Sequence, residues 1–135
     1  MTRAEAQRIA FKNTDGRCIF TGLSGGDPAH VFSAGDYHAL ANCPWNIFYI
    51  VRGCHSVRGE ACFDFLQVEG VDIVRPVSQR IWMIENMMPE AMWDYRPRVR
   101  RTLQLLAEEC GRVGIEYPTP RNPPDYHKLK LRGRE

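Results

Sequence analysis

The chain has 135 residues, of which 44% are hydrophobic and 25% charged, and its formal net charge is +2. These values are typical of one globular domain with a core of ordinary size. No stretch approaches the roughly 18 apolar residues that a membrane span needs, and the N-terminus lacks the apolar segment of a signal peptide. We therefore expect a cytoplasmic protein without membrane contact.

Five cysteines are scattered along the chain, an odd number with no C-x-x-C pair among them. This pattern argues against the disulfide framework of a small secreted domain and against a complete zinc knuckle. We expect most of them to be buried thiols in a reducing compartment. They are Cys18, Cys43, Cys54, Cys62 and Cys110.

The N-terminal segment predicts a helix followed by short irregular structure. Thr2 and Glu5 have the spacing of a capping box, and an apolar stripe continues to about Phe11. Residues 13–26 then predict a turn, a short strand over 17–21 and a flexible glycine-containing loop.

The central segment predicts two strands and a helix. Residues 28–33 form the first predicted strand. Residues 47–51 are β-branched and aromatic and predict a strand buried on both faces, although their periodicity also allows a helix. Gly53 breaks this run, and we expect a helix that begins near Cys54 and continues into the sixties.

The C-terminal part predicts three helices. The first is capped by Ser78 and ended by Pro89, and the second is short and runs through Trp93 and Tyr95. The third is stopped by Gly111. The buried stripe of the first helix consists of Val77, Ile81, Ile84 and Met88, and that of the third of Val99, Leu103, Leu106 and Cys110.

Basic side chains gather in the last third of the chain. Residues 95–135 hold 10 of the 18 Lys and Arg residues but 5 of the 16 Asp and Glu residues. From residue 117 onward four prolines oppose regular structure, and the chain ends in a basic arm. Such a segment favours contact with a polyanion, although solvated charge alone also explains it.

Three side chains within residues 27–55 could carry chemistry: His30, Asn46 and His55. Each also has an ordinary structural explanation, because isolated histidines are mostly packing or surface residues and asparagine is common in turns. His30 follows a flexible loop that can expose it, and His55 is expected at the start of a helix, which is a rigid place for a ligand. His30 precedes Asn46 by 16 positions, and Asn46 precedes His55 by 9.

Four fragments in this order and spacing resemble the HNH endonuclease family, whose fold is called ββα-metal. A further pair of residues resembles a Phe-Asp pair that follows the last histidine in one branch of the family. The resemblance covers roughly residues 18–64. The four fragments are Cys18–Gly22, Ala29–Val31, Pro44–Ile47 and Cys54–His55, and the further pair is Phe63–Asp64.

The resemblance implies an α+β protein with a small ββα-metal (HNH-like) core, flanking N-terminal and C-terminal helices and a basic C-terminal arm. Residues 1–116 would form a single domain, with the motif core at 18–68 and a helical extension at 76–111. Residues 117–135 would form the Pro-rich basic tail.

The resemblance also implies a role for each candidate residue. His30 would be the general base that takes a proton from the attacking water, and Asn46 would orient it or brace the loop. His55 would ligate a divalent cation that polarises the scissile phosphate. Mg²⁺ is the expected ion, with Mn²⁺ and Zn²⁺ as alternatives.

The metal ligands are fewer than in many family members. Ala29 stands where many have a ligand, and Gly59 stands where many have a second histidine. Asp27 is the nearest carboxylate and is the second predicted ligand. Asp36, Asp64 or bound phosphate are further sources of oxygen ligands.

We therefore expect a metal-dependent DNA endonuclease of the HNH type, similar to small phage or mobile-element proteins, with low sequence specificity or a preference for DNA structure. The alternative is a catalytically degenerate HNH-like protein that binds nucleic acid or a partner nuclease without cleaving. A protein partner or a homodimer is compatible with both. Phosphate contacts are expected from Arg96, Arg98, Arg100, Arg101, Lys128, Lys130 and Arg132.

Overall fold

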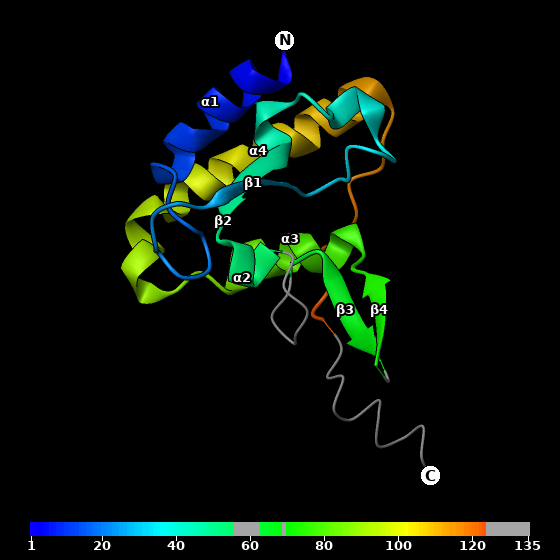
Figure 1. The fold of residues 1–135 in the computed structure, drawn as a ribbon. Helices are drawn as coiled ribbons and strands as arrows, with labels where there is room; N and C mark the ends of the chain where they lie inside the picture. Colours follow the sequence, from blue (N-terminus) through cyan, green and yellow to red (C-terminus); the bar gives the residue numbers. More distant parts are fainter. Residues whose placement is uncertain (56–62, 69, 124–135) are drawn as a thin grey trace.

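The computed structural model describes residues 1–55, 63–68 and 70–123, and within them the protein has an α+β fold (Figure 1). The predicted α+β class is therefore confirmed. The elements in chain order are α1 (Arg3–Thr14), β1 (Asp27–His30), η1 (His38–Leu40), η2 (Pro44–Asn46), β2 (Ile47–Ile50), α2 (Arg52–His55), β3 (Phe65–Val68), β4 (Val71–Val74), α3 (Val77–Asn86), η3 (Glu90–Tyr95) and α4 (Arg96–Val113), where η marks a 3₁₀ helix.

An antiparallel pair, β1 and β2, lies at the centre of the molecule, with His30 opposite Ile47. Ile47 packs with two alanines of α1, and Tyr49 packs against the same cluster. Phe48 and Ile50, which alternate with them, belong to the larger core. The predicted strand buried on both faces is therefore confirmed, and β2 ends one residue earlier than predicted.

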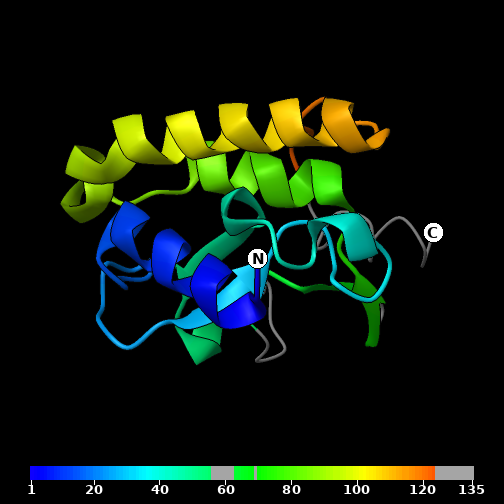
Figure 2. The same ribbon diagram turned by 90° about the horizontal axis from the view of Figure 1, so that it is seen from above.

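The two longer helices of the C-terminal half, α3 and α4, lie alongside each other on one side of the β1–β2 pair (Figure 2). They join the main core through the apolar stripes that the sequence predicts, including Ile81, Ile84, Leu103 and Leu106. No helix in the described ranges is long and apolar enough to cross a lipid bilayer.

The N-terminal helix is capped as predicted but is longer than predicted. The Thr2 hydroxyl accepts a hydrogen bond from the Glu5 amide at 3.2 Å, and α1 continues to Thr14. The strand predicted over residues 17–21 is wrong. The Cys18 amide bonds to the Leu23 carbonyl instead, so this segment closes on itself as a turn.

The centre of the chain contains a strand pair that the sequence interpretation missed. β3 and β4 pair antiparallel, with Gly70 between them at a φ of 80°. The helix predicted to continue into the sixties is therefore wrong from residue 65. Strand-forming residues stand on both sides of a glycine turn, Phe65 and Val68 before it and Val71, Ile73 and Val74 after it, and this pattern favours a hairpin. Its predicted course over residues 56–62 lies outside the described residues. The part that is described, α2, begins two residues before Cys54.

Two helix ends differ from the predictions. Ser78 is inside α3, because Pro76 precedes the first helical residue and its fixed φ suits that position. Gly111 does not stop α4. The helix continues to Val113 and ends at Gly114, which has a left-handed φ of 78° and donates its amide to the Cys110 carbonyl.

Candidate functional site

Asn46 holds the chain in place immediately after His30. Its side chain is fully buried, and its Oδ1 accepts from the Phe32 amide at 2.8 Å. Its Nδ2 donates to the carbonyls of Phe32 at 2.9 Å and Leu40 at 3.1 Å. Its own carbonyl accepts from the Val31 amide at 3.0 Å. One amide side chain therefore fixes both the exit from β1 and the loop that follows.

The His30 imidazole is half-buried, and its Nε2 lies 2.9 Å from the Ala41 carbonyl oxygen. Because a carbonyl oxygen can only accept, this hydrogen bond assigns the proton of the neutral ring to Nε2. In this tautomer Nδ1 is the unprotonated ring nitrogen. Ala41 lies at the end of η1, so the loop that Asn46 braces also selects the tautomer of His30.

His30 lines a cleft of about 310 Å³ at the end of β1. Two carboxylates, Asp36 and Asp64, line the same cleft, together with the guanidinium-bearing Arg80. The cleft therefore combines an imidazole, two acids and a cation, drawn from β1, the loop after it, the segment before β3 and α3.

Arg80 connects the segments that form this cleft. It is 5% exposed, and it donates to the carbonyls of His30 at 3.0 Å and Asp64 at 3.2 Å. Its Nε donates to the Arg75 carbonyl at 3.1 Å, and its Nη1 lies 3.8 Å from an Asp64 carboxylate oxygen. Its guanidinium carbon lies 5.4 Å from the centre of the Phe63 ring. A buried charge of this kind is stable only when its donors are occupied.

Arg80 is not among the site residues predicted from the sequence, although the sequence contains a signal for it. Arg80 falls three positions after Val77 and four before Ile84, on the apolar stripe of α3. A charged residue on a buried stripe indicates a buried partner, because an uncompensated charge there would be costly. One such partner is the main-chain carbonyl of His30. It lies 50 positions earlier in the chain, so the helical pattern alone does not identify it.

The two predicted metal ligands have different outcomes. Asp27 is exposed at the opposite end of β1 from His30, about 10 Å away along an extended strand. Because the two are three residues apart, they also point to opposite faces of the strand pair. The main chain of His55 ends α2, and its side chain lies outside the described part of the structure, so its predicted role stays a prediction.

The described residues alone do not form a complete metal site. Within residues 1–55, 63–68 and 70–123 there is no group of three His, Cys, Asp or Glu side chains that could hold a metal ion together. Asp36 and Asp64 line the same cleft as His30, whereas Asp27 does not line it.

Two predicted DNA-contacting arginines, Arg96 and Arg98, lie beside two aromatic rings where η3 meets α4, together with Arg17, which was not predicted. The Arg96 guanidinium lies 4.9 Å from the centre of the Trp93 ring, and that ring is 47% exposed. Arg17 and Arg98 each lie 5.7 Å from the centre of the Tyr95 ring. We call these five residues the η3–α4 surface.

Of the other predicted contacts, Arg100 and Arg101 are exposed on the first turns of α4, and Arg101 donates to Gln104 at 3.5 Å. Arg98 pairs weakly with Asp15 at 3.9 Å. The three basic residues of the terminal arm lie outside the described residues. They are Lys128, Lys130 and Arg132.

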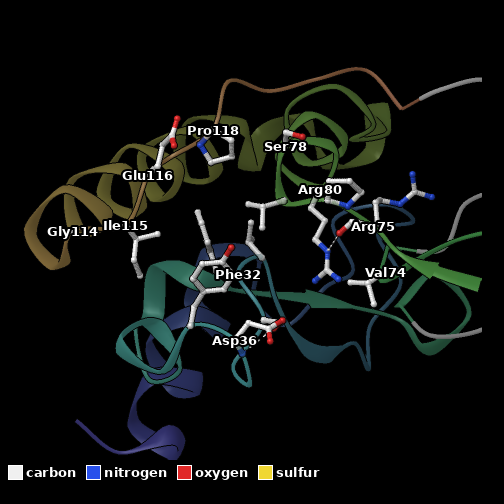
Figure 3. A pocket seen from close by; sticks show the side chains of 15 residues that line it. Phe32, Asp36, Val74, Arg75, Ser78, Arg80, Gly114, Ile115, Glu116 and Pro118 are labelled. Carbon is white, nitrogen blue, oxygen red and sulfur yellow. Dashed lines mark hydrogen bonds between the residues drawn. The ribbon is translucent and has the colours of Figure 1, made fainter.

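A larger cavity of about 720 Å³ adjoins the His30 cleft. The two have four lining residues in common, Ser33, Asp36, Val74 and Arg80. In Figure 3 the labelled side chains surround it from three directions: Phe32 and Asp36 after β1, Arg75 and Ser78 around the start of α3, and Ile115 and Glu116 after α4.

Comparisons with models of protein families, with curated proteins and with solved structures find no match. The family resemblance therefore rests on the sequence fragments, and a functional proposal has to be argued from the residues around His30.

Proposed function

We propose that the protein is a metal-dependent DNA endonuclease of the HNH type, in which His30 is the general base. The observation that carries the proposal is the setting of the His30 ring. Its Nε2 is engaged by the Ala41 carbonyl, and the chain on either side of it is held by the pairing of β1 with β2 and by the buried amide of Asn46. A general base requires a fixed ring and a defined tautomer, and these contacts supply both.

In this proposal each residue has a limited task. The Nδ1 atom of His30 takes a proton from a water molecule as that water attacks the phosphorus atom, because imidazole exchanges protons near neutral pH. Asn46 keeps the ring in place through the loop and does not touch the substrate. Arg80 fixes the carbonyl of His30 against Asp64 and keeps the wall of the cleft in position.

The divalent ion, Mg²⁺ in preference to Mn²⁺ or Zn²⁺, belongs to the same proposal. When bound, it would polarise the scissile phosphate and stabilise the leaving oxygen. His55 with a carboxylate of the His30 cleft would hold it, and Asp64 suits this better than Asp27 because Asp64 lines that cleft. Carboxylate oxygens are the ligands that Mg²⁺ prefers.

DNA is the proposed substrate because arginines and exposed aromatic surface occur together. On the η3–α4 surface, Arg96 stacks on the exposed Trp93, and the guanidinium groups of Arg17 and Arg98 each lie 5.7 Å from the centre of the Tyr95 ring. Arginines bind phosphates, and aromatic rings offer faces on which bases stack. Neither type of contact selects a base sequence, which agrees with the expected low specificity.

The test is cleavage of supercoiled plasmid with Mg²⁺, Mn²⁺, Zn²⁺ or a chelator, comparing the wild type with His30→Ala. We expect nicking that needs a metal ion and is lost in the variant. His38→Ala is the matched control, because His38 is an exposed histidine on η1 outside the cleft. It should nick like the wild type.

The alternative, nucleic-acid binding without cleavage, is motivated by Ala29 and Gly59, which stand where many HNH proteins have metal ligands. Salt-sensitive DNA binding without nicking in any metal would support this alternative. Nicking that persists in His30→Ala would overturn the role of His30.

A further inference from the structure

We infer that the larger cavity beside the His30 cleft binds one unpaired nucleobase of the DNA substrate, next to the phosphate that is cleaved. The inference rests on the proposed function for the identity of its ligand, but it concerns a cavity that His30 itself does not line. It assigns the substrate class as DNA with an unpaired nucleotide, either single-stranded or bulged.

The two cavities are positioned for neighbouring parts of one nucleotide chain. Four lining residues belong to both, so the two cavities are immediate neighbours. A phosphate that approaches His30 therefore has the larger cavity immediately beside it. Its volume of about 720 Å³ lies within the range of sites that bind small organic groups.

The walls of the larger cavity suit a planar, uncharged group. Val31, Phe32 and Tyr37 line it on the β1 side, and Ile115 and Pro118 line it on the side of the segment after α4. The aromatic residues form an edge-to-face pair, with ring centres 5.1 Å apart. Val31 and Phe32 are almost fully buried behind this wall, so its accessible part consists of Tyr37, Ile115 and Pro118. Such a surface holds a base by stacking on the Tyr37 ring and by the exclusion of water.

The charges of the cavity disfavour a phosphate inside it. Arg75 and Arg80 line it, but Arg75 donates to Gln79 at 3.2 Å and to the Phe65 carbonyl at 3.3 Å, and Arg80 donates to three carbonyls. Two carboxylates, Asp36 and Glu116, also line the cavity and would repel an anion. Carboxylates do accept hydrogen bonds from the amino groups on base edges.

A base that is paired within a duplex cannot enter this cavity, because its faces and edges are already occupied. Unstacking costs least when the nucleotide is already unpaired. The cavity therefore gives selectivity for DNA structure without reading a sequence.

The experiment measures binding by fluorescence anisotropy with a chelator present, so that no cleavage occurs. Three labelled duplexes are compared: fully paired, with a single-nucleotide bulge, and with the same bulge lacking its base. We expect the bulge with a base to bind on the order of tenfold more tightly than the abasic bulge. Ile115→Trp and Ser78→Tyr, which fill the cavity from different sides, should bring this ratio close to one.

Leu23→Trp is the matched control, because Leu23 is 62% exposed and does not line the cavity. It should keep the wild-type ratio. A wild-type ratio of one, or a ratio that persists in both filled variants, would overturn the inference. His30→Ala should keep the ratio while losing nicking. Nicking that survives in His30→Ala would therefore count against the proposed function and leave the binding result standing.

Discussion

At the scale of single residues, the buried amide of Asn46 makes three hydrogen bonds that a different side chain could not all replace. Replacing it by a carboxylate removes both donors and places a negative oxygen against two carbonyls, those of Phe32 and Leu40. We expect Asn46→Asp to lower the free energy of unfolding by about 3 kcal/mol at pH 7. Urea unfolding measures this. The control is Asn42→Asp at an exposed position, where a change above about 0.5 kcal/mol would contradict the argument.

Two buried arginines allow the role of Arg80 to be separated from general packing. Arg75 and Arg80 are both almost fully buried, but only Arg80 contacts His30. Lysine keeps the charge and loses the planar fork of donors. We expect Arg80→Lys to lower kcat for nicking more than tenfold with KM within about twofold, and Arg75→Lys to leave kcat nearly unchanged. Equal losses of kcat in the two variants would show that the effect is only structural.

The buried thiol of Cys110 makes stability depend on pH in the alkaline range. Burial, reinforced by the nearby Cys43 and Glu109, raises the pKa of Cys110 from 9.0 to about 11. Below pH 9 the thiol is protonated in both states and contributes no slope. Between pH 9 and 11 the unfolded chain loses the proton while the folded protein keeps it, so stability falls. Cys110→Ala removes this contribution of the thiol to the pH dependence of stability.

The measurement is urea unfolding of both proteins at pH 8 and pH 11. Cys110→Ala should be less stable at pH 8, because it leaves a small cavity, and the difference from the wild type should narrow by pH 11. A difference that stays constant over this range would contradict the role of burial.

At the scale of elements, the strong local signals could be predicted from sequence. The capping role of Thr2, the buried strand β2 and the apolar stripes of α3 and α4 follow from residue types a few positions apart. The errors lie where two local signals compete. Residues 65–74 combine two short runs of mainly apolar residues with a glycine turn, and two glycines stand at the end of α4, Gly111 within it and Gly114 just after it, of which only Gly114 is left-handed.

Replacing each of the two glycines at the end of α4 by alanine should change the free energy of unfolding in opposite directions. Gly111 lies inside the helix, and a Cβ there would meet nothing within 4 Å. Gly111→Ala should therefore raise the free energy of unfolding by about 0.5–1 kcal/mol. Gly114 has a φ of 78°, which strains any residue with a side chain, so Gly114→Ala should lower it by about 1 kcal/mol. Thermal unfolding distinguishes the two, and a gain in both variants would contradict the cap assignment.

At the scale of the whole molecule, only some of the residues around the candidate base, His30, could be predicted from the sequence. His30 and Asn46 belong to fragments within one strand pair, so their spacing carries the information. The contact of Arg80 with His30 joins positions 50 apart, and the sharing of a cleft by His30 and Asp64 depends on the same long-range packing. Periodicity is a local property and cannot encode such contacts.

The gathering of basic residues in the last third of the chain could be predicted from the sequence. Their positions in space relative to the cavities could not, because these positions depend on the fold. Arg96 and Arg98 of the η3–α4 surface lie at the start of α4, whereas Gly114, which lines the larger cavity, follows its end. An α-helix of 18 residues is about 27 Å long. This is roughly the length of eight base pairs, so one DNA molecule could reach both places.

The dependence of DNA binding on salt concentration tests whether the η3–α4 surface contacts phosphates. Arg96 rests on an exposed tryptophan, and Arg96→Ala should weaken DNA binding at every salt concentration and reduce the slope of log K against log salt by about one. Arg112 is the matched control, because it lies near the other end of α4 and its charge is already paired with Glu109. Arg112→Ala should leave the slope unchanged. If the two substitutions reduced the slope equally, binding would depend on net charge alone and not on the η3–α4 surface.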